Sequence, residues 1–291
     1  MIQVSKIDDG ILTQIVLKFR EEPIIFSLVL ILALVNWNAE AQKFKLLIRS
    51  EIKLTNTRAL FTILGGMAIS NFTPARSGEY IGRGLLLKKL HPIKVVIATV
   101  TGNIAQVMMT YSIGLSCMVG MAFLGDYGSV WQEFNKVWML IMVMIFITLL
   151  ILFIKPLLRW LKPRIPKQIT KAFRLIKKYD RKLFAKVVAI AFIRYTVFAL
   201  QFFLLLQLFS NFSLPVYTIA LIPIAYVMQS VAPVPAISDI GVRVFVTTLL
   251  FGSLLSDNAI LHAVTCLWFI NLILPGLIGT IYLVSSTVRN K

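Results

Sequence analysis

Five long runs of apolar residues constrain this chain more than any other feature. A helix needs roughly 20 consecutive apolar residues to cross the hydrocarbon core of a bilayer. Inside lipid, a helix also satisfies its own backbone hydrogen bonds. We therefore expect an all-α polytopic membrane protein with about five full spans, built as a single transmembrane domain over residues 24–285. The runs lie at residues 24–47, 95–124, 137–160, 187–209 and 259–285.

A strong positive charge accompanies this apolar composition. The chain is 58% hydrophobic and has a formal net charge of +18, although only 14% of its residues are charged. Disordered chains have low hydrophobicity, so that class is excluded. A soluble nucleic-acid binder is disfavoured, because a basic binding surface does not require so apolar a body. We expect no nucleic-acid partner, and we read the Lys and Arg residues as a signal of membrane topology.

Residues 1–23 precede the first apolar run and differ from a cleavable signal peptide. They contain four acidic residues and no long apolar core, whereas a signal peptide combines a basic start with an apolar centre. Their apolar residues recur near helical spacing. We therefore expect a short amphipathic helix that lies on the membrane surface.

The sequence offers no group of residues that is typical of a metal, redox or nucleotide site. Cys117 and Cys266 each lie inside an apolar run, without metal-site spacing or a disulfide framework. His91 and His262 have no partner at metal or catalytic spacing. The sequence also contains no glycine-rich phosphate loop and no dinucleotide fingerprint. We expect no metal and no cofactor, and an enzyme is the less favoured interpretation.

Two further apolar regions, residues 59–90 and 216–255, are interrupted by polar residues and prolines. Basic residues flank the first region on both sides, whereas the flanks of the second, residues 210–215 and 256–258, contain no Lys or Arg. Basic loops tend to remain in the cytoplasm. The first region then enters from the cytoplasm and returns there, and the second does the same from the outer face. Each is predicted to be a re-entrant helical hairpin.

The order of these segments predicts an inverted-topology repeat, an architecture found in many secondary transporters. Repeat one covers residues 24–124 and repeat two covers residues 187–285. A linking span and a basic loop join them over residues 137–186, and residues 155–186 hold twelve of the thirty Lys and Arg residues. The rule for basic loops places this loop and the tail, residues 286–291, in the cytoplasm.

The two interruptions align without gaps at an offset of 160 residues. Residues 70–83 read SNFTPARSGEYIGR, and residues 230–243 read SVAPVPAISDIGVR. In each segment an acid precedes an arginine by four positions, which places both side chains on one face of a helix. The pairs are Glu79 with Arg83 and Asp239 with Arg243.

The breaks in these helices have a chemical cause in proline and glycine. Pro74, Pro233 and Pro235 cannot donate a backbone hydrogen bond. Gly78 and Gly241 permit unusual backbone angles. Non-helical backbone at membrane depth persists only where it is buried in protein or lines a wet cavity. We therefore expect a polar pocket at these breaks.

Charged residues inside a membrane cost about 2.5–3.5 kcal/mol each, so they usually face protein or water. Seven of them are candidates for a polar site where the two hairpin tips meet near the bilayer midplane. The arginines can hold a lipid phosphate through charge-assisted hydrogen bonds. The acids can balance the arginines, bind a cationic head group or carry a coupling proton. Alternatively, the acid–arginine pairs only hold the broken helices in place. The seven are Glu40, Arg76, Glu79, Arg83, Arg194, Asp239 and Arg243.

Amide side chains in the spans have a simpler interpretation. Asn36 lies late in the first run, close to Glu40, and Asn271 lies in the last run. Such side chains commonly form hydrogen bonds between membrane helices. We therefore expect them to join helices rather than to bind a ligand, and the same role is an alternative for Glu40.

Three segments carry a resemblance to a known family. They read NWNAEAQKFKLL (residues 36–47), NFTPARSGEYIGRGLLLKK (residues 71–89) and PVPAISDIGVRVFV (residues 233–246). Together they resemble the flippase-like transmembrane domain of lysylphosphatidylglycerol synthases and its stand-alone relatives, over about residues 24–285. Many relatives have a Glu shortly after the second glycine, whereas Arg243 is the nearest charged residue here.

The resemblance implies a protein of the bacterial cytoplasmic membrane that moves a phospholipid or a polyprenyl-linked lipid between leaflets. Its partners would be membrane lipids with an anionic phospholipid or polyprenyl phosphate head group. The chain contains no soluble aminoacyl-transferase domain, so it resembles the transporting part of such synthases and not the synthesising part. Two alternatives remain: a transferase that acts on a polyprenyl carrier, as reported for some relatives, and an accessory subunit of a lipid-modifying enzyme.

Overall fold

The computed structural model describes residues 10–73, 76–124, 180–230 and 238–288. Within these ranges the chain forms helices and their connections, and no strand. Three parts of the sequence prediction fall outside them: the linking span, most of the basic loop, and the prolines of the two breaks. Those prolines are Pro74, Pro233 and Pro235.

Four helices are long and apolar enough to cross a membrane. They correspond to four of the five runs that the sequence predicts as full spans, and the fifth run, residues 137–160, lies outside the described ranges. The chain is therefore a multi-pass, all-helical membrane protein. The four helices are Pro23–Ile48, Pro92–Met121, Arg181–Phe209 and Asp257–Ser286.

Within each described range, short connections join consecutive helices. The segment η4 is a 3₁₀-helix and η5 is a π-helix. In chain order the elements are α1 (Gly10–Glu21), α2 (Pro23–Ile48), α3 (Asn56–Ser70), α4 (Gly78–Leu86), α5 (Pro92–Leu124), α8 (Arg181–Phe209), η4 (Val216–Ala220), α9 (Leu221–Ser230), α10 (Asp239–Phe251), α11 (Asp257–Trp268), η5 (Phe269–Ile273) and α12 (Leu274–Val288).

Several helix starts follow from local chemistry. Pro23 and Pro92 are the first residues of α2 and α5, where the missing proline N–H costs no hydrogen bond. The side chain of Thr55 accepts a hydrogen bond from the backbone N–H of Arg58 and so caps α3. Ser256 caps α11 in the same way.

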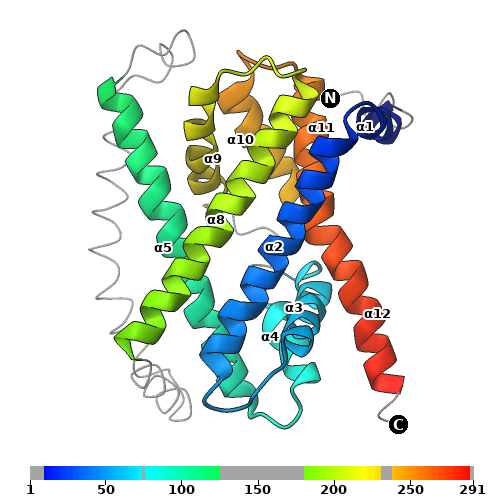
Figure 1. Ribbon diagram of the computed structural model, residues 1–291, viewed down its shortest axis with the longest axis vertical. Helices are drawn as coiled ribbons and strands as arrows, with labels where there is room; N and C mark the ends of the chain where they lie inside the picture. Colours follow the sequence, from blue (N-terminus) through cyan, green and yellow to red (C-terminus); the bar gives the residue numbers. More distant parts are fainter. Residues whose placement is uncertain (1–9, 74–75, 125–179, 231–237, 289–291) are drawn as a thin grey trace.

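The long helices run in two opposite directions (Figure 1). The helix α2 and the continuous helix α11–η5–α12 run from the upper end of the figure to the lower end, whereas α5 and α8 run upward. The short pair α3 and α4 lies in the lower half of the bundle, and the short pair α9 and α10 lies in the upper half. The chain therefore contains two helical units of similar order whose elements run in opposite directions.

The two short pairs also agree in where their helices end and begin. The helix α3 ends at Ser70, and the described part of α9 runs to Ser230, 160 residues further along the chain. After the breaks, α4 begins at Gly78 and α10 begins at Asp239, within one residue of the same offset. The second helix of each pair therefore begins within one residue of the position that the alignment predicts.

Close backbone contacts hold α3, α4 and α12 together. A Cβ atom added to Gly82 of α4 would overlap the carbonyl oxygen of Gly65 in α3. A Cβ atom added to Gly279 of α12 would overlap the carbonyl oxygen of Leu64. Helices in membranes gain packing energy from such close approach, because lipid provides no hydrophobic drive between helices.

The outward faces of the long helices are apolar. Ile24 of α2 is 81% exposed and Ile281 of α12 is 69% exposed. Exposed apolar side chains on this scale would be unfavourable in water, but they match a lipid environment. Polar and charged side chains are instead gathered inside the bundle, where the candidate site lies.

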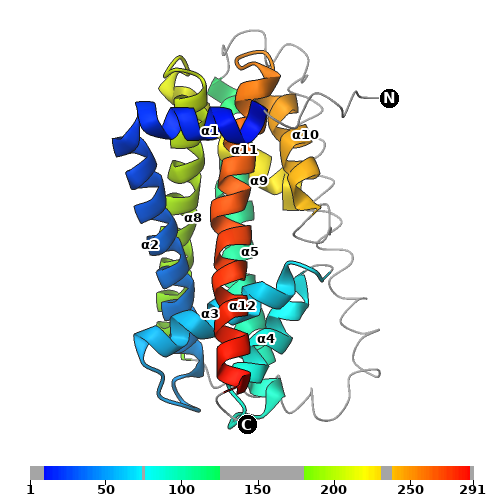
Figure 2. The ribbon, with the colours of Figure 1, turned by 90° about the vertical axis from the view of Figure 1, so that its right-hand side faces the viewer.

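The first helix lies across the upper end of the bundle (Figure 2). Phe19 of α1 stacks on Phe26 of α2 with ring centroids 3.4 Å apart. The ammonium of Lys18 donates a 2.9 Å hydrogen bond to Oδ1 of Asn211, in the connection after α8. The predicted N-terminal helix is therefore present over Gly10–Glu21, and it is tied to the start of one long helix and the end of another.

Candidate functional site

The carboxylate of Glu40 is the centre of a buried ionic cluster. Glu40 lies on α2 and is 2% exposed. Its Oε1 atom lies 3.1 Å from Nη2 of Arg83 on α4. Its Oε2 atom lies 2.6 Å from Nη1 of Arg194 on α8 and 2.6 Å from Nζ of Lys43. One carboxylate therefore joins three cations from three helices, and we call these residues together with Glu79 the Glu40 cluster.

Arg83 is, with Lys43, one of the two most enclosed members of the Glu40 cluster, and 1% of its surface is exposed. It forms an ion pair with Glu79, one turn earlier on α4, as the sequence spacing predicts. Its Nη1 atom donates a 3.2 Å hydrogen bond to Oγ1 of Thr99 on α5. Its guanidinium carbon also lies 4.9 Å from the ring centroid of Phe44. This cation–π contact and the ion pairs fix the side chain in one geometry.

Arg194 connects the cluster to α8 and retains some access, with 20% of its side chain exposed. Its Nε atom donates a 2.8 Å hydrogen bond to Oδ1 of Asn36. Asn36 in turn donates a 3.0 Å bond to Oδ1 of Asn271 in the π-helix. Asn271 donates a 2.9 Å bond to Oε1 of Gln201. The prediction that Asn36 and Asn271 join helices is confirmed, and Glu40 joins helices through ion pairs.

A second charged group, which we call the tip cluster, consists of Arg76, Asp239 and Arg243. Arg243 lies one turn after Asp239 on α10, and its Nη2 atom is 2.7 Å from Oδ2 of Asp239, as the spacing predicts. Arg76 comes from the break before α4, and its Nη2 atom lies 3.9 Å from the same oxygen. The first break therefore lies against the start of α10, although 163 positions separate Arg76 from Asp239 in the chain.

The two clusters are neighbours. Arg76 is close enough to Glu79 and Arg194 for a Coulombic interaction with both. All seven residues that the sequence nominates therefore lie in one polar region, four in the Glu40 cluster and three in the tip cluster. The region takes side chains from α2, α4, α8 and α10 and from the break between α3 and α4.

The backbone at the first break differs in one detail from the sequence prediction. The left-handed conformation is adopted by Arg76, with φ of 56°, whereas Gly78 and Gly241 do not have positive φ. Gly78 serves another purpose, because a Cβ atom there would lie only 2.7 Å from the carbonyl oxygen of Ile69. Gly241 lies within α10 and a Cβ atom there would contact nothing within 4 Å.

The polar region has a surplus of positive charge. It contains four arginines and Lys43 against three carboxylates, those of Glu40, Glu79 and Asp239. Arg76, which comes from the first break, has 44% of its side chain exposed. Such an arrangement suits an anion, because guanidinium groups present paired donors to phosphate or carboxylate oxygens.

Lys43 is the member of the cluster that the sequence analysis does not nominate. It is 1% exposed and lies three residues after Glu40 on α2. Residues three apart on a helix share a face, so this spacing is a signal that could have found it. The sequence interpretation instead counts Lys43 among the basic residues that set the topology.

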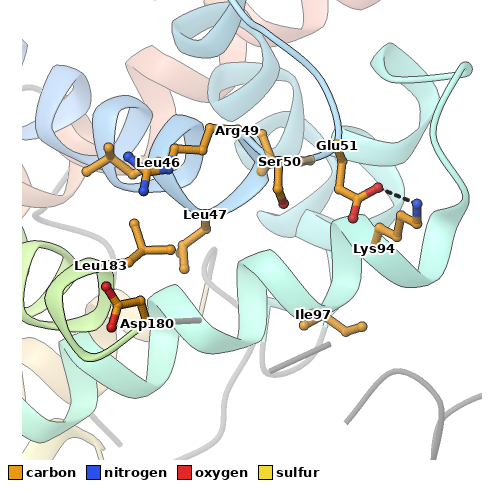
Figure 3. Close-up of a pocket in the computed structure, with 10 residues that line it drawn as sticks. Leu46, Leu47, Arg49, Ser50, Glu51, Lys94, Ile97, Asp180 and Leu183 are labelled. Carbon is orange, nitrogen blue, oxygen red and sulfur yellow. Dashed lines mark hydrogen bonds and ion pairs between the residues drawn. The ribbon is translucent and has the colours of Figure 1, made fainter. Parts of the chain in front are cut away.

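A separate pocket of about 340 Å³ lies at the lower end of the bundle (Figure 3). It is bounded by the end of α2 and by the starts of α5 and α8, and the Glu51–Lys94 ion pair stands on one side of it. None of the seven nominated residues lines it. Among the described residues, no three His, Cys, Asp or Glu side chains gather as a metal site.

Comparison with known proteins identifies the family of the chain. A search of curated proteins gave no match to the sequence. Residues 4–279 match the family model described as the lysylphosphatidylglycerol synthase TM region. The match covers all the described helices up to the middle of α12. The chain therefore belongs to the lysylphosphatidylglycerol synthase transmembrane-region family, a family of membrane proteins tied to lipid metabolism or transport.

Proposed function

We propose that this protein moves a phospholipid or a polyprenyl-linked lipid between the leaflets of a bacterial cytoplasmic membrane. The contact between Arg76 and Asp239 carries the proposal, because it brings the first helix break and the start of α10 into one polar region. A lipid that crosses a membrane needs a polar path for its head group, since charged groups cost several kcal/mol in hydrocarbon. The family membership supports the same substrate class.

The proposal includes a topology with two re-entrant hairpins. In it, α3–α4 enters from the cytoplasm and α9–α10 enters from the outer face, so that the tip cluster lies near the midplane. The opposite directions of the two helical units support this topology. The basic residues at the lower end, such as Arg49, Lys53 and Lys186, support a cytoplasmic position for that end. The C-terminal end of α12 then also faces the cytoplasm.

Single-cysteine labelling tests the topology. In a background with Cys117 and Cys266 replaced by Ala, cysteines at Ser50 and Lys88 should react from the cytoplasmic side, and one at Asn211 should react from the outside. Ser50 and Lys88 flank the α3–α4 pair, so reaction from opposite faces would show that this pair crosses the membrane. The inverted repeat would then be wrong.

In the proposed mechanism, the tip cluster holds the anionic phosphate of the head group. Arg76 and Arg243 share one carboxylate, Asp239, so the cluster has one positive charge in excess. A phosphodiester carries one negative charge and restores neutrality. Each charge-assisted hydrogen bond contributes about 1.5–3 kcal/mol. The Glu40 cluster lies beside this position and holds α2, α4 and α8 in place around it.

A reconstitution experiment tests the function. The purified protein is placed in phosphatidylglycerol–phosphatidylethanolamine vesicles with a trace of fluorescent phosphatidylglycerol, and a reductant that cannot cross the bilayer reports how much probe reaches the outer leaflet. We expect the double variant Arg76→Gln, Arg243→Gln to move the probe at least about tenfold more slowly, since a loss of 1.4 kcal/mol is a tenfold change.

The matched control for this experiment is Arg58→Gln, at the exposed start of α3 outside both clusters. It should move the probe at the wild-type rate. Equal rates for the wild type and the double variant, with unchanged thermal stability, would remove the tip cluster from the transport path. No movement by the wild type with any anionic lipid probe would refute the proposed function itself.

A further inference from the structure

The helix α5 presents uncharged polar side chains to the charged clusters. Thr99, Asn103 and Gln106 lie four and three positions apart, so they share one face of the helix. Nδ2 of Asn103 donates a 3.4 Å hydrogen bond to Oε2 of Glu79. Oε1 of Gln106 accepts a 3.5 Å hydrogen bond from Nη1 of Arg194. These three residues, which we call the α5 stripe, therefore line one side of the polar region.

The α5 stripe also lies beside the tip cluster. Glu79 and Arg194 belong to the Glu40 cluster, and both are close enough to Arg76 for a Coulombic interaction. Asn103 and Gln106 bond to these same two residues. Both bonds are longer than the usual range of about 2.7–3.2 Å, so the amides can exchange them for a ligand at little cost. A head group whose phosphate lies on the tip cluster therefore has the stripe next to it.

The charged groups that a ligand can reach at this position are mainly positive. The side chains of Arg76 and Arg194 are 44% and 20% exposed. The three carboxylates of the region are at most 12% exposed, and each already forms an ion pair with at least one arginine. No carboxylate of the two clusters is thus left over for a cationic head group.

A surplus of positive charge remains after a phosphate has bound. A phosphodiester neutralises the tip cluster, which has one positive charge in excess. The Glu40 cluster still has three cations and two carboxylates. Residues 95–110 of α5 contain no ionisable side chain that could offset this charge. An ammonium group on the same lipid would therefore meet positive surroundings, and like charges at close range oppose binding strongly.

An uncharged amide suits a hydroxyl group, which both donates and accepts hydrogen bonds. Gln106 uses its carbonyl oxygen for Arg194, and its amide nitrogen donates to no side chain in the described part of the chain. We propose that the polar region selects lipids whose head group combines one phosphodiester charge with hydroxyl groups and carries no ammonium, and that Asn103 and Gln106 bind those hydroxyls. The inference rests on the proposed function and adds its head-group specificity.

Transport of three matched probes tests this specificity. Each probe is a phospholipid labelled on an acyl chain and followed in vesicles with the impermeant reductant. Phosphatidylglycerol has the charge and the hydroxyls, phosphatidylmethanol has the same charge without hydroxyls, and phosphatidylethanolamine has an ammonium. For the wild type we expect phosphatidylethanolamine to move at least about tenfold more slowly than phosphatidylglycerol. Phosphatidylmethanol should move about two- to tenfold more slowly, as the loss of a hydrogen bond predicts.

Variants of Gln106 separate hydroxyl binding from a structural role. Gln106→Leu has a similar size but no amide, and it should move phosphatidylglycerol and phosphatidylmethanol at equal rates. Gln106→Glu adds a carboxylate that can face an ammonium, so the rate for phosphatidylethanolamine should rise toward that for phosphatidylglycerol. A purely structural change would alter all three rates alike and leave their ratios unchanged.

The matched control is Gln42→Leu, the same substitution on α2. The amide of Gln42 bonds to Asn38 on the same helix, outside both clusters. This variant should keep the wild-type ratios between the three probes.

A competition experiment distinguishes the two sources of such a head group, a glycerol phospholipid and a sugar on a polyprenyl phosphate. A short-chain isoprenyl phosphoglucose should slow the phosphatidylglycerol probe more than the matched isoprenyl methyl phosphate does. Equal slowing by both competitors would overturn the inference for sugar head groups.

The outcomes separate the inference from the proposed function. If the wild type moves phosphatidylethanolamine as fast as phosphatidylglycerol, the inference is wrong although transport is real. Wild-type probe ratios in Gln106→Leu would likewise remove the α5 stripe from head-group binding. A wild type that moves none of the three probes would instead contradict the proposed function.

Discussion

Replacing Glu40 with Gln should be among the most damaging single changes in this protein. Gln keeps the size of the side chain but removes the negative charge that Arg83 and Arg194 share, at 3.1 Å and 2.6 Å. Removing one partner of a buried ion pair costs about 3–5 kcal/mol, because a buried charge is left uncompensated. Arg83 is 1% exposed, so its guanidinium has no access to water that would relieve this cost.

This loss should be visible in a thermal melt. Each kcal/mol shifts the midpoint by about 2–4 °C in proteins of 150–250 residues. The expected drop for Glu40→Gln is therefore about 6–20 °C. A dye that becomes fluorescent on reaction with thiols provides the assay, since Cys266 is 4% exposed and reacts when the bundle opens. All variants are heated at one rate, because unfolding of membrane proteins is often irreversible.

The matched control is Glu51→Gln, which removes the carboxylate of the Glu51–Lys94 pair. The side chains of that pair are 26% and 36% exposed, and exposed ion pairs contribute about 0–1 kcal/mol. The expected drop for this variant is at most about 4 °C. If Glu40→Gln and Glu51→Gln melt at the same temperature, the Glu40 cluster does not stabilise the fold and the charge argument behind it is refuted.

Three further experiments have defined outcomes in the same assay. Gly279→Ala forces a methyl group against the carbonyl oxygen of Leu64 and should lower the free energy of unfolding by about 1–3 kcal/mol. The control Gly120→Ala adds a methyl group that contacts nothing and should raise it by up to about 1 kcal/mol. Equal melting midpoints for the two variants would contradict the close packing of α12. A double-mutant cycle with Asn36→Ala and Asn271→Ala should give a coupling of about 0.6–1.7 kcal/mol, and additive effects would show that their hydrogen bond contributes nothing. Thr55→Ala removes the cap of α3 and should cost about 1 kcal/mol; an unchanged midpoint would show that the cap does not stabilise the helix.

Patterns along one helix were sufficient to predict much of the fold and several side-chain pairs. Apolar length predicted four of the long helices, and the four-residue spacing predicted the ion pairs Glu79–Arg83 and Asp239–Arg243, which both form. These features depend only on the geometry of a single helix. The sequence can therefore carry them without information about neighbouring elements.

Contacts between helices were harder to predict, because they depend on how each helix is rotated about its axis. The chain contains basic residues at many positions near helix ends. Only the three-residue spacing from Glu40 distinguishes Lys43, which turns inward, from Lys45, which bonds to Asn56 at the surface. The left-handed conformation of Arg76 was also missed, since such φ values are uncommon outside glycine and depend on the surroundings.

The π-helix of residues 269–273 has a consequence for the far end of the molecule. A π turn holds one more residue than an α turn, so it rotates everything after it by roughly 100° relative to an unbroken α-helix. Gly279 meets Leu64 of α3 beyond this turn, and Asn71 donates a 2.9 Å hydrogen bond to the carbonyl oxygen of Leu272 within it. The extra residue therefore sets the angular register of the last helix, and without it α12 would present a different side to α3.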